Sequence, residues 1–162
     1  TIKGIGNYTD SKQLAYVVSI KKGATYVVAG YKYKVLSSAK VAIVGASAKS
    51  KKKIVVKNTV TIGGKVCKIV EIGNNAFKNY KKLKKVTIGK NVTKIGAKAF
   101  YGAKNLNSIK FQGTKITKIG ANAWKNINKN AVFEMKEKGT AKLKKMLTAK
   151  TGFVESMEIH SK

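Results

Sequence analysis

The residues that could perform acid–base or nucleophilic chemistry are few in this sequence. The single histidine, His160, stands two residues before the C-terminus, where we expect it to be exposed to solvent. Nucleophilic catalysis usually requires such a base beside its nucleophile. Paired carboxylates that cleave glycosidic bonds are not indicated by the spacing of the acids, which are Asp10, Glu71, Glu134, Glu137, Glu155 and Glu158. We therefore predict a protein that is not an enzyme and has no catalytic residues.

Metal and cofactor sites are not indicated either. The one cysteine, Cys67, excludes an internal disulfide and any site built from several cysteines. Its polar–apolar neighbours predict a small buried side chain on a strand. The Gly-Gly pair in residues 62–65 lacks the first glycine and the Ser/Thr of a phosphate-binding loop. We predict that the chain binds no metal and no cofactor.

The positive charge of the chain comes entirely from lysine side chains. Thirty-five basic residues stand against six acidic ones, giving a net charge of +29, and no arginine occurs. Because bidentate recognition of guanine edges is arginine chemistry, we predict no specific binding to nucleic acid. The lysines are either a solvated coat or a source of diffuse attraction to anionic polymers.

Three similar units follow one another along the chain. They begin at Ile72, Ile95 and Ile119, so the repeat is 23–24 residues long. The same slots recur in each unit, as shown by the columns Ala76, Ala99, Ala123; Phe77, Phe100, Trp124; Leu83, Leu106, Asn130; Val86, Ile109, Phe133; and Ile88, Phe111, Met135. A unit this short buries its apolar side only by stacking on its copies. The pattern therefore predicts a solenoid, with Trp124 buried and stacked on Phe100.

The flanks of the repeats predict other elements. Residues 54–62 and the run after Gly63-Gly64 are typical of two strands joined by a tight turn. The segment GTAKLKKMLTAKTGF (139–153) predicts a helix that begins at Gly139 or Thr140. Its apolar side, which consists of Leu143, Met146 and Leu147, would seal the last coil, with a membrane-surface helix as the alternative.

Together these patterns predict an α/β repeat solenoid with short parallel strands and short helical turns at the Ala-Phe segments. We expect a β-rich N-terminal cap at 21–66, repeats at 67–136, and a C-terminal cap of helix and strand at 137–162. Residues 1–20 lack every repeat slot and are interpreted as the end of a preceding β module.

The motif Ile-Gly-x-x-Ala-Phe, followed by Leu-x-x-Val/Ile-x-Ile/Phe, resembles the BspA-like leucine-rich repeats of bacterial surface proteins. The match covers residues 54–136, and residues 1–20 are similar to the last strands of immunoglobulin-like surface modules. The family commonly has cysteine where this chain has Tyr80 and Ala103, so packing near Tyr80 should differ. The resemblance implies adhesion or ligand binding at a bacterial surface or outside the cell. It offers no shared catalytic residues.

In repeats of this kind, side chains between the inward positions of each strand point outward and align from coil to coil. The expected column is Val55, Thr87, Lys110 and Glu134, with Lys85, Ser108 and Val132 beside it. We predict that Lys110 and Glu134 are neighbours on adjacent parallel strands. The candidate ligand-binding residues are Lys85, Thr87, Ser108, Lys110, Val132 and Glu134.

The predicted function is therefore non-catalytic binding of an extracellular protein or glycan by a monomer. Two alternatives stay open. One is lysine-driven binding to anionic polymers, and the other is a structural spacer with no ligand. No apolar run approaches the ~20 residues that a membrane-spanning helix requires.

Overall fold

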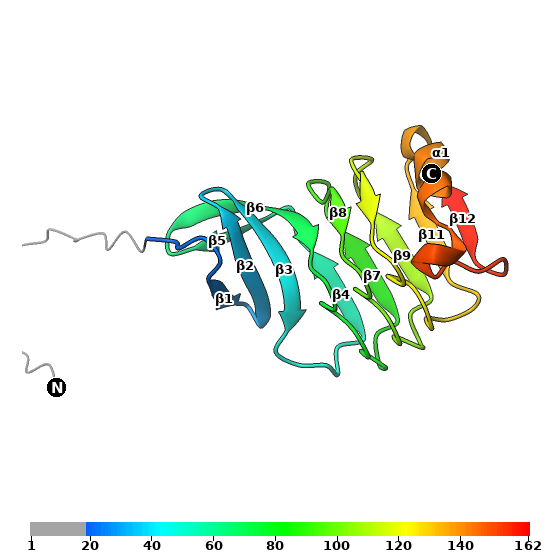
Figure 1. Cartoon of the computed structure of the whole chain (residues 1–162), viewed down its shortest axis with the longest axis horizontal. Helices are drawn as coiled ribbons and strands as arrows, with labels where there is room; N and C mark the ends of the chain where they lie inside the picture. The colour runs from blue at the N-terminus through cyan, green and yellow to red at the C-terminus, as the bar shows by residue number, and fades with distance from the viewer. Residues whose placement is uncertain (1–18) are drawn as a thin grey trace, which may run out of the picture.

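A computed structural model describes residues 19–162, which form a row of stacked coils (Figure 1). Within these residues the strands make two sheets. The seven-stranded sheet contains β1 (Thr25–Val28), β2 (Tyr31–Ser37), β3 (Lys40–Ala46), β5 (Thr59–Ile62), β6 (Lys65–Ile72), β8 (Lys94–Ile95) and β10 (Lys118–Ile119). The five-stranded sheet contains β4 (Lys53–Val56), β7 (Lys85–Ile88), β9 (Ser108–Phe111), β11 (Val132–Met135) and β12 (Glu158–Ser161). The predicted module at residues 1–20 lies almost wholly outside the described part of the chain.

All neighbours in the five-stranded sheet are parallel, in the order β4-β7-β9-β11-β12. Alternate residues of each strand point to opposite sides of a sheet. The inward positions are apolar and buried, as in Val86, Ile109 and Phe133. The period-two alternation in the sequence therefore determines which side of this sheet packs on the core.

The chain between β4 and β6 changes sheets. Residues 54–62, predicted as one strand, divide into β4 and β5, which belong to different sheets. The predicted hairpin is confirmed between β5 and β6, where Gly63 and Gly64 have φ angles of 54° and 78°. The boundary expected after residue 66 falls inside β6, and β4 pairs with β7 of the first repeat. Cap and repeats are thus structurally continuous, and their division into domains stays a prediction.

The Ala-Phe segments form consecutive turns, so the prediction of short helical turns there was wrong. Asn75 and Asn79 have positive φ angles of 56° and 61°, which interrupt any helix. The backbone N–H of Phe77 donates to the Ala99 carbonyl at 2.7 Å, in the following coil. The N–H groups of Asn75 and Asn79 also bond to the following coil, whereas the N–H groups at the positions between bond three residues back within the turns.

The core contains a continuous row of aromatic rings. Trp124 is 0% exposed, and its ring is parallel to that of Phe100 within 6° at a centroid distance of 4.8 Å. Phe77 stacks on the other side of Phe100 at 5.3 Å. The predicted stack is confirmed, because side chains that share a repeat slot come into register when the coils stack.

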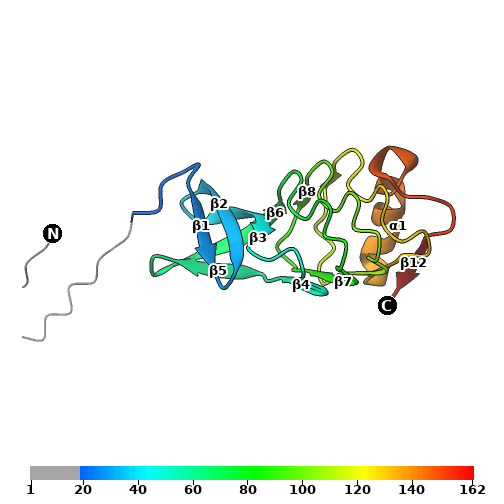
Figure 2. The same cartoon turned by 90° about the horizontal axis from the view of Figure 1, so that it is seen from below.

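The C-terminal helix α1 (Glu137–Met146) lies at the end of the row opposite β1, as Figure 1 and Figure 2 agree. It begins two residues before the expected Gly139 and is followed by a short 3-10 helix, η1 (Ala149–Thr151), within the predicted range 139–153. Leu143 and Leu147 are buried in the core. Because these side chains already pack inside the protein, they are not available to lie on a membrane.

Tyr80 links the first repeat to the N-terminal strands. Its hydroxyl donates to the Ala46 carbonyl at 3.0 Å and accepts from the Ala46 N–H at 3.1 Å, in a buried site. Its ring also makes an edge contact with Phe77 at 5.4 Å. The Tyr80 phenol therefore joins β3 to the first turn segment, and packing there depends on this side chain as expected.

We expect Tyr80→Phe to lower the free energy of unfolding by ~1–3 kcal/mol, because buried polar groups of Ala46 lose their partner. Urea unfolding followed by circular dichroism measures the change. Tyr101→Phe is the control, since Tyr101 is only half-buried, and its effect should stay within ~0.5 kcal/mol. Equal effects of the two substitutions would show that the Tyr80 hydroxyl does not hold the junction.

Candidate functional site

The structure brings the predicted outward residues together on the five-stranded sheet. Lys85, Ser108 and Val132 are register partners on β7, β9 and β11. Thr87 aligns with Val55 on one side and Lys110 on the other. We call this surface the strand-lined face, defined by Val55, Lys85, Thr87, Ser108, Lys110, Val132 and Glu134. Its role in binding stays a prediction.

The predicted neighbourhood of Lys110 and Glu134 is confirmed. The two residues are direct partners on the parallel strands β9 and β11. Lys110 is exposed and Glu134 is half-buried. A pair of charges near the surface contributes only ~0–1 kcal/mol to stability.

Strand β12 extends the same surface beyond the predicted residues. Glu158 pairs with Val132, and His160 pairs with Glu134. His160 is exposed as expected, with half of its side chain accessible, and its Nε2 lies 2.7 Å from the Glu158 carboxylate. It lies in β12, paired with β11. The alternation in residues 157–161 indicates a strand, but it does not identify β11 as the partner of that strand.

Glu134 lies in a positive field. Lys162 Nζ donates to Glu134 Oε2 at 2.8 Å. This hydrogen bond is the main reason that the pKa of the Glu134 carboxyl is lowered from its ordinary value. Partial burial acts in the opposite direction, whereas the charges of Lys162, Lys110 and His160 lower the pKa further. Glu134 is therefore a carboxylate at neutral pH and is surrounded by cations.

A cavity of about 510 Å³ opens at the carboxyl ends of the same strands. Phe111 and Met135, the last residues of β9 and β11, contribute to its lining and are almost fully buried. Glu134 also lines it. The other polar lining residues are Asn58, Lys90, Lys110, Gln112, Lys136 and Lys162. This cavity adjoins the strand-lined face, because Lys110 and Glu134 belong to both.

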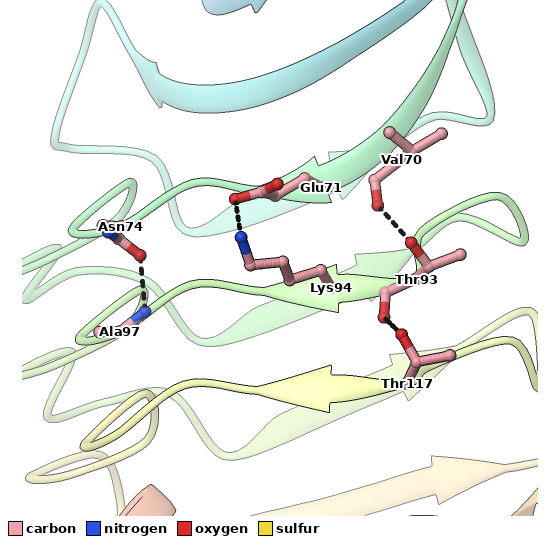
Figure 3. A network of polar contacts seen from close by, with 7 residues as sticks. All are labelled: Val70, Glu71, Asn74, Thr93, Lys94, Ala97 and Thr117. Atoms are coloured by element: carbon pink, nitrogen blue, oxygen red, sulfur yellow. Dashed lines mark hydrogen bonds and ion pairs between the residues drawn. The ribbon is translucent and has the colours of Figure 1, made fainter. Parts of the chain in front are cut away.

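The seven-stranded sheet carries a different polar pattern, which Figure 3 shows. Thr117 Oγ1 donates to the Thr93 carbonyl at 3.0 Å, and Thr93 Oγ1 donates to the Val70 carbonyl at 3.2 Å. Glu71 and Lys94 form an ion pair at 3.1 Å. These side chains join successive coils to one another.

We also looked in the described part of the chain for metal ligands, a reactive cysteine and a membrane-spanning helix. Residues 19–162 contain no group of three or more His, Cys, Asp or Glu side chains that could hold a metal ion. Cys67 is buried in β6, as its neighbours predicted. Among the helices of this region, none is long and apolar enough to cross a membrane.

The repeats match the model of a known protein family. The model of the BspA type leucine rich repeat region matches residues 51–162, in six copies. No curated protein matches the sequence significantly.

Two solved structures share the fold. A leucine rich cell surface protein from Faecalibacterium prausnitzii A2-165 is 23% identical with a TM-score of 0.59, over 70% of this chain and 33% of that one. A leucine-rich repeat protein from Bacteroides ovatus ATCC 8483 is 21% identical with a TM-score of 0.54, over 67% of this chain and 31% of that one. The present chain thus spans about a third of the length of each of these proteins.

Proposed function

Because the chain belongs to the family of proteins with BspA type leucine rich repeats, we propose that it is a non-catalytic binding module of a bacterial cell surface. It recognises an extracellular protein or glycan through the strand-lined face. One of the similar structures is named a leucine rich cell surface protein, which supports this location.

The observation that carries the proposal is the register of the five parallel strands. Outward residues of β4, β7, β9 and β11 align in unbroken rows. One row presents Val55, Thr87, Lys110 and Glu134 in succession, which are apolar, hydroxyl, basic and acidic groups. A mixed surface of this kind suits contacts with a protein or a glycan, since it offers donors, acceptors and apolar area together.

The strand-lined face also argues against the lysine coat as the whole function. A surface that held only anionic polymers would be expected to present lysine along the entire row, and here only Lys110 does so. Three lysines, Lys53, Lys85 and Lys110, lie on the outward side of β4, β7 and β9, whereas Glu134 and Glu158 lie on β11 and β12. The outward side of this sheet therefore carries both basic and acidic groups.

A blocking substitution tests this proposal. We expect Thr87→Tyr, which places a bulky ring in the middle of the strand-lined face, to weaken ligand binding about tenfold or more. The measurement is a binding panel of immobilised matrix proteins and glycans, run at low salt and at ~0.15 M salt. The control is Thr61→Tyr, at an exposed position on β5 in the other sheet.

The alternatives give different results in the same panel. Binding that disappears at ~0.15 M salt and is equal in both variants would indicate lysine-driven attraction to polyanions. A panel without any salt-resistant binding would indicate a spacer. Binding that resists salt but ignores Thr87→Tyr would show that another surface holds the ligand. Each of these outcomes contradicts the proposal.

A further inference from the structure

The cavity of about 510 Å³ is formed by residues that follow consecutive strands. Gln112, Lys136 and Lys162 come directly after β9, β11 and β12. Asn58 and Lys90 stand two residues after β4 and β7. Since parallel strands in register end at the same edge of a sheet, the residues that follow them converge there. The repeat geometry thus gathers these side chains into one volume.

Two hydrogen bonds to Asn58 hold the wall of the cavity that lies toward the N-terminal strands. The Lys90 backbone N–H donates to Asn58 Oδ1 at 2.7 Å. The Asn91 side chain donates to the Asn58 carbonyl at 3.1 Å. The loop after β4 is therefore tied to the loop after β7, which holds the polar wall in place before any ligand arrives.

The charge around the cavity is strongly positive. Four ammonium groups, from Lys90, Lys110, Lys136 and Lys162, surround a single carboxylate, Glu134. That carboxylate already pairs with Lys162 at 2.8 Å, which leaves three ammonium groups without an acidic partner in the residues that the structure describes. A volume of this size is about 10 Å across, close to the Debye length of ~8 Å at physiological salt. These lysines therefore act together on one bound group.

Glu134 and the amides determine what kind of anion fits. A bare anion such as sulfate offers only acceptors, and the Glu134 carboxylate repels it. A sugar carries hydroxyl donors that Glu134 and Asn58 can accept, while the lysines balance a negative group on the same ring. The volume lies in the ~300–1,000 Å³ range of small-ligand sites.

We infer that this cavity binds one unit of an acidic saccharide, a sugar ring that carries hydroxyls and a carboxylate. The inference rests on the proposed function, because the cavity adjoins the strand-lined face and would anchor one end of a glycan that lies along it. Lys90 and Lys110 contact the carboxylate, and Glu134 accepts from the hydroxyls. In this way two of the many lysines, Lys90 and Lys110, have a specific role in binding.

Titration calorimetry at ~0.15 M salt tests the inference with three probes. The first is a hexuronate trisaccharide, the second is the neutral hexose trisaccharide with the same linkages, and the third is inorganic sulfate. We expect the uronate to bind at least tenfold more tightly than either of the others. Sulfate or neutral sugar binding as tightly as the uronate would overturn the inference.

Matched lysine pairs locate the site. The double variant Lys90→Gln/Lys110→Gln should weaken uronate binding about tenfold or more. The double variant Lys40→Gln/Lys68→Gln removes the same charge from exposed positions on β3 and β6 of the other sheet, away from the cavity and from the strand-lined face, and should weaken it less than about twofold. Melting curves verify that both variants fold. Equal losses in the two pairs would mean diffuse attraction and would overturn the inference.

The test separates this inference from the proposed function. If Thr87→Tyr blocks binding in the panel while the uronate trisaccharide does not bind, the strand-lined face is a binding surface and the cavity is not a saccharide site. If the uronate binds and only the Lys90/Lys110 pair affects it, the inference holds whatever the panel shows for Thr87→Tyr.

Discussion

Replacing Trp124 with alanine is expected to lower the free energy of unfolding by ~3–5 kcal/mol. The indole is fully buried, stacks on Phe100 at 4.8 Å, and makes an edge contact with Phe133 at 5.1 Å. Its removal opens a cavity between two coils, and a solenoid depends on each such interface. Urea unfolding followed by circular dichroism measures the loss.

Trp124→Phe is the matched control, because Phe77 and Phe100 occupy the same slot in the preceding coils. Within residues 19–162 the buried Trp124 Nε1 has no hydrogen-bond partner. Phenylalanine removes this unpaired donor, which offsets part of the cost of the smaller ring. We expect a loss of no more than ~1.5 kcal/mol. A loss below ~1 kcal/mol for Trp124→Ala would contradict the importance of the stack.

Gly120→Ala is expected to destabilise the protein by about 3 kcal/mol, through steric overlap with the backbone of the preceding coil. A Cβ at residue 120 would meet the Ala97 N and lie 2.7 Å from the Ala97 Cα. Neither backbone atom can move without separating the two coils. The glycine of the Ile-Gly motif is thus required by close approach where one repeat stacks on another. The midpoint of urea unfolding should fall accordingly.

The first unit provides the control for this substitution. A Cβ at Gly73 would lie 3.0 Å from Val44 Cγ1, which is the end of a side chain, and 3.4 Å from the Ile43 carbonyl oxygen. Small shifts of Val44 relieve that contact, so Gly73→Ala should cost less than about 1 kcal/mol. Similar losses at Gly73 and Gly120 would show that close approach of the coils does not determine the cost at Gly120.

The repeat period and the alternation of apolar residues were sufficient to predict the main packing. Equal slots 23–24 residues apart placed Phe100 and Trp124 in contact, and the outward slot placed Lys110 beside Glu134. Both outcomes follow from one-dimensional patterns, because stacking identical coils converts a fixed sequence offset into a neighbour in space. The turn between β5 and β6 could also be predicted, because its signal is a pair of adjacent glycines.

The backbone of the turn segments required the tertiary structure. Alternate N–H groups of these segments bond to carbonyls in the next coil, as Phe77 does to Ala99, and no local pattern reveals a partner 22 residues away. The sequence nevertheless contained a signal against helix in these segments. Asn75, Asn79 and Asn126 stand at left-handed positions, a conformation that asparagine tolerates better than most residues.

By itself, the sequence determined the solenoid, its repeat length and the members of the strand-lined face. Only the tertiary structure decided that β12 adds His160 to that face, that Tyr80 reaches Ala46, and that Lys90 and Lys162 meet at one cavity. These contacts join residues from loops and ends that share no repeat slot. Their positions depend on how far the coils twist and where each strand stops, which are properties of the packed molecule.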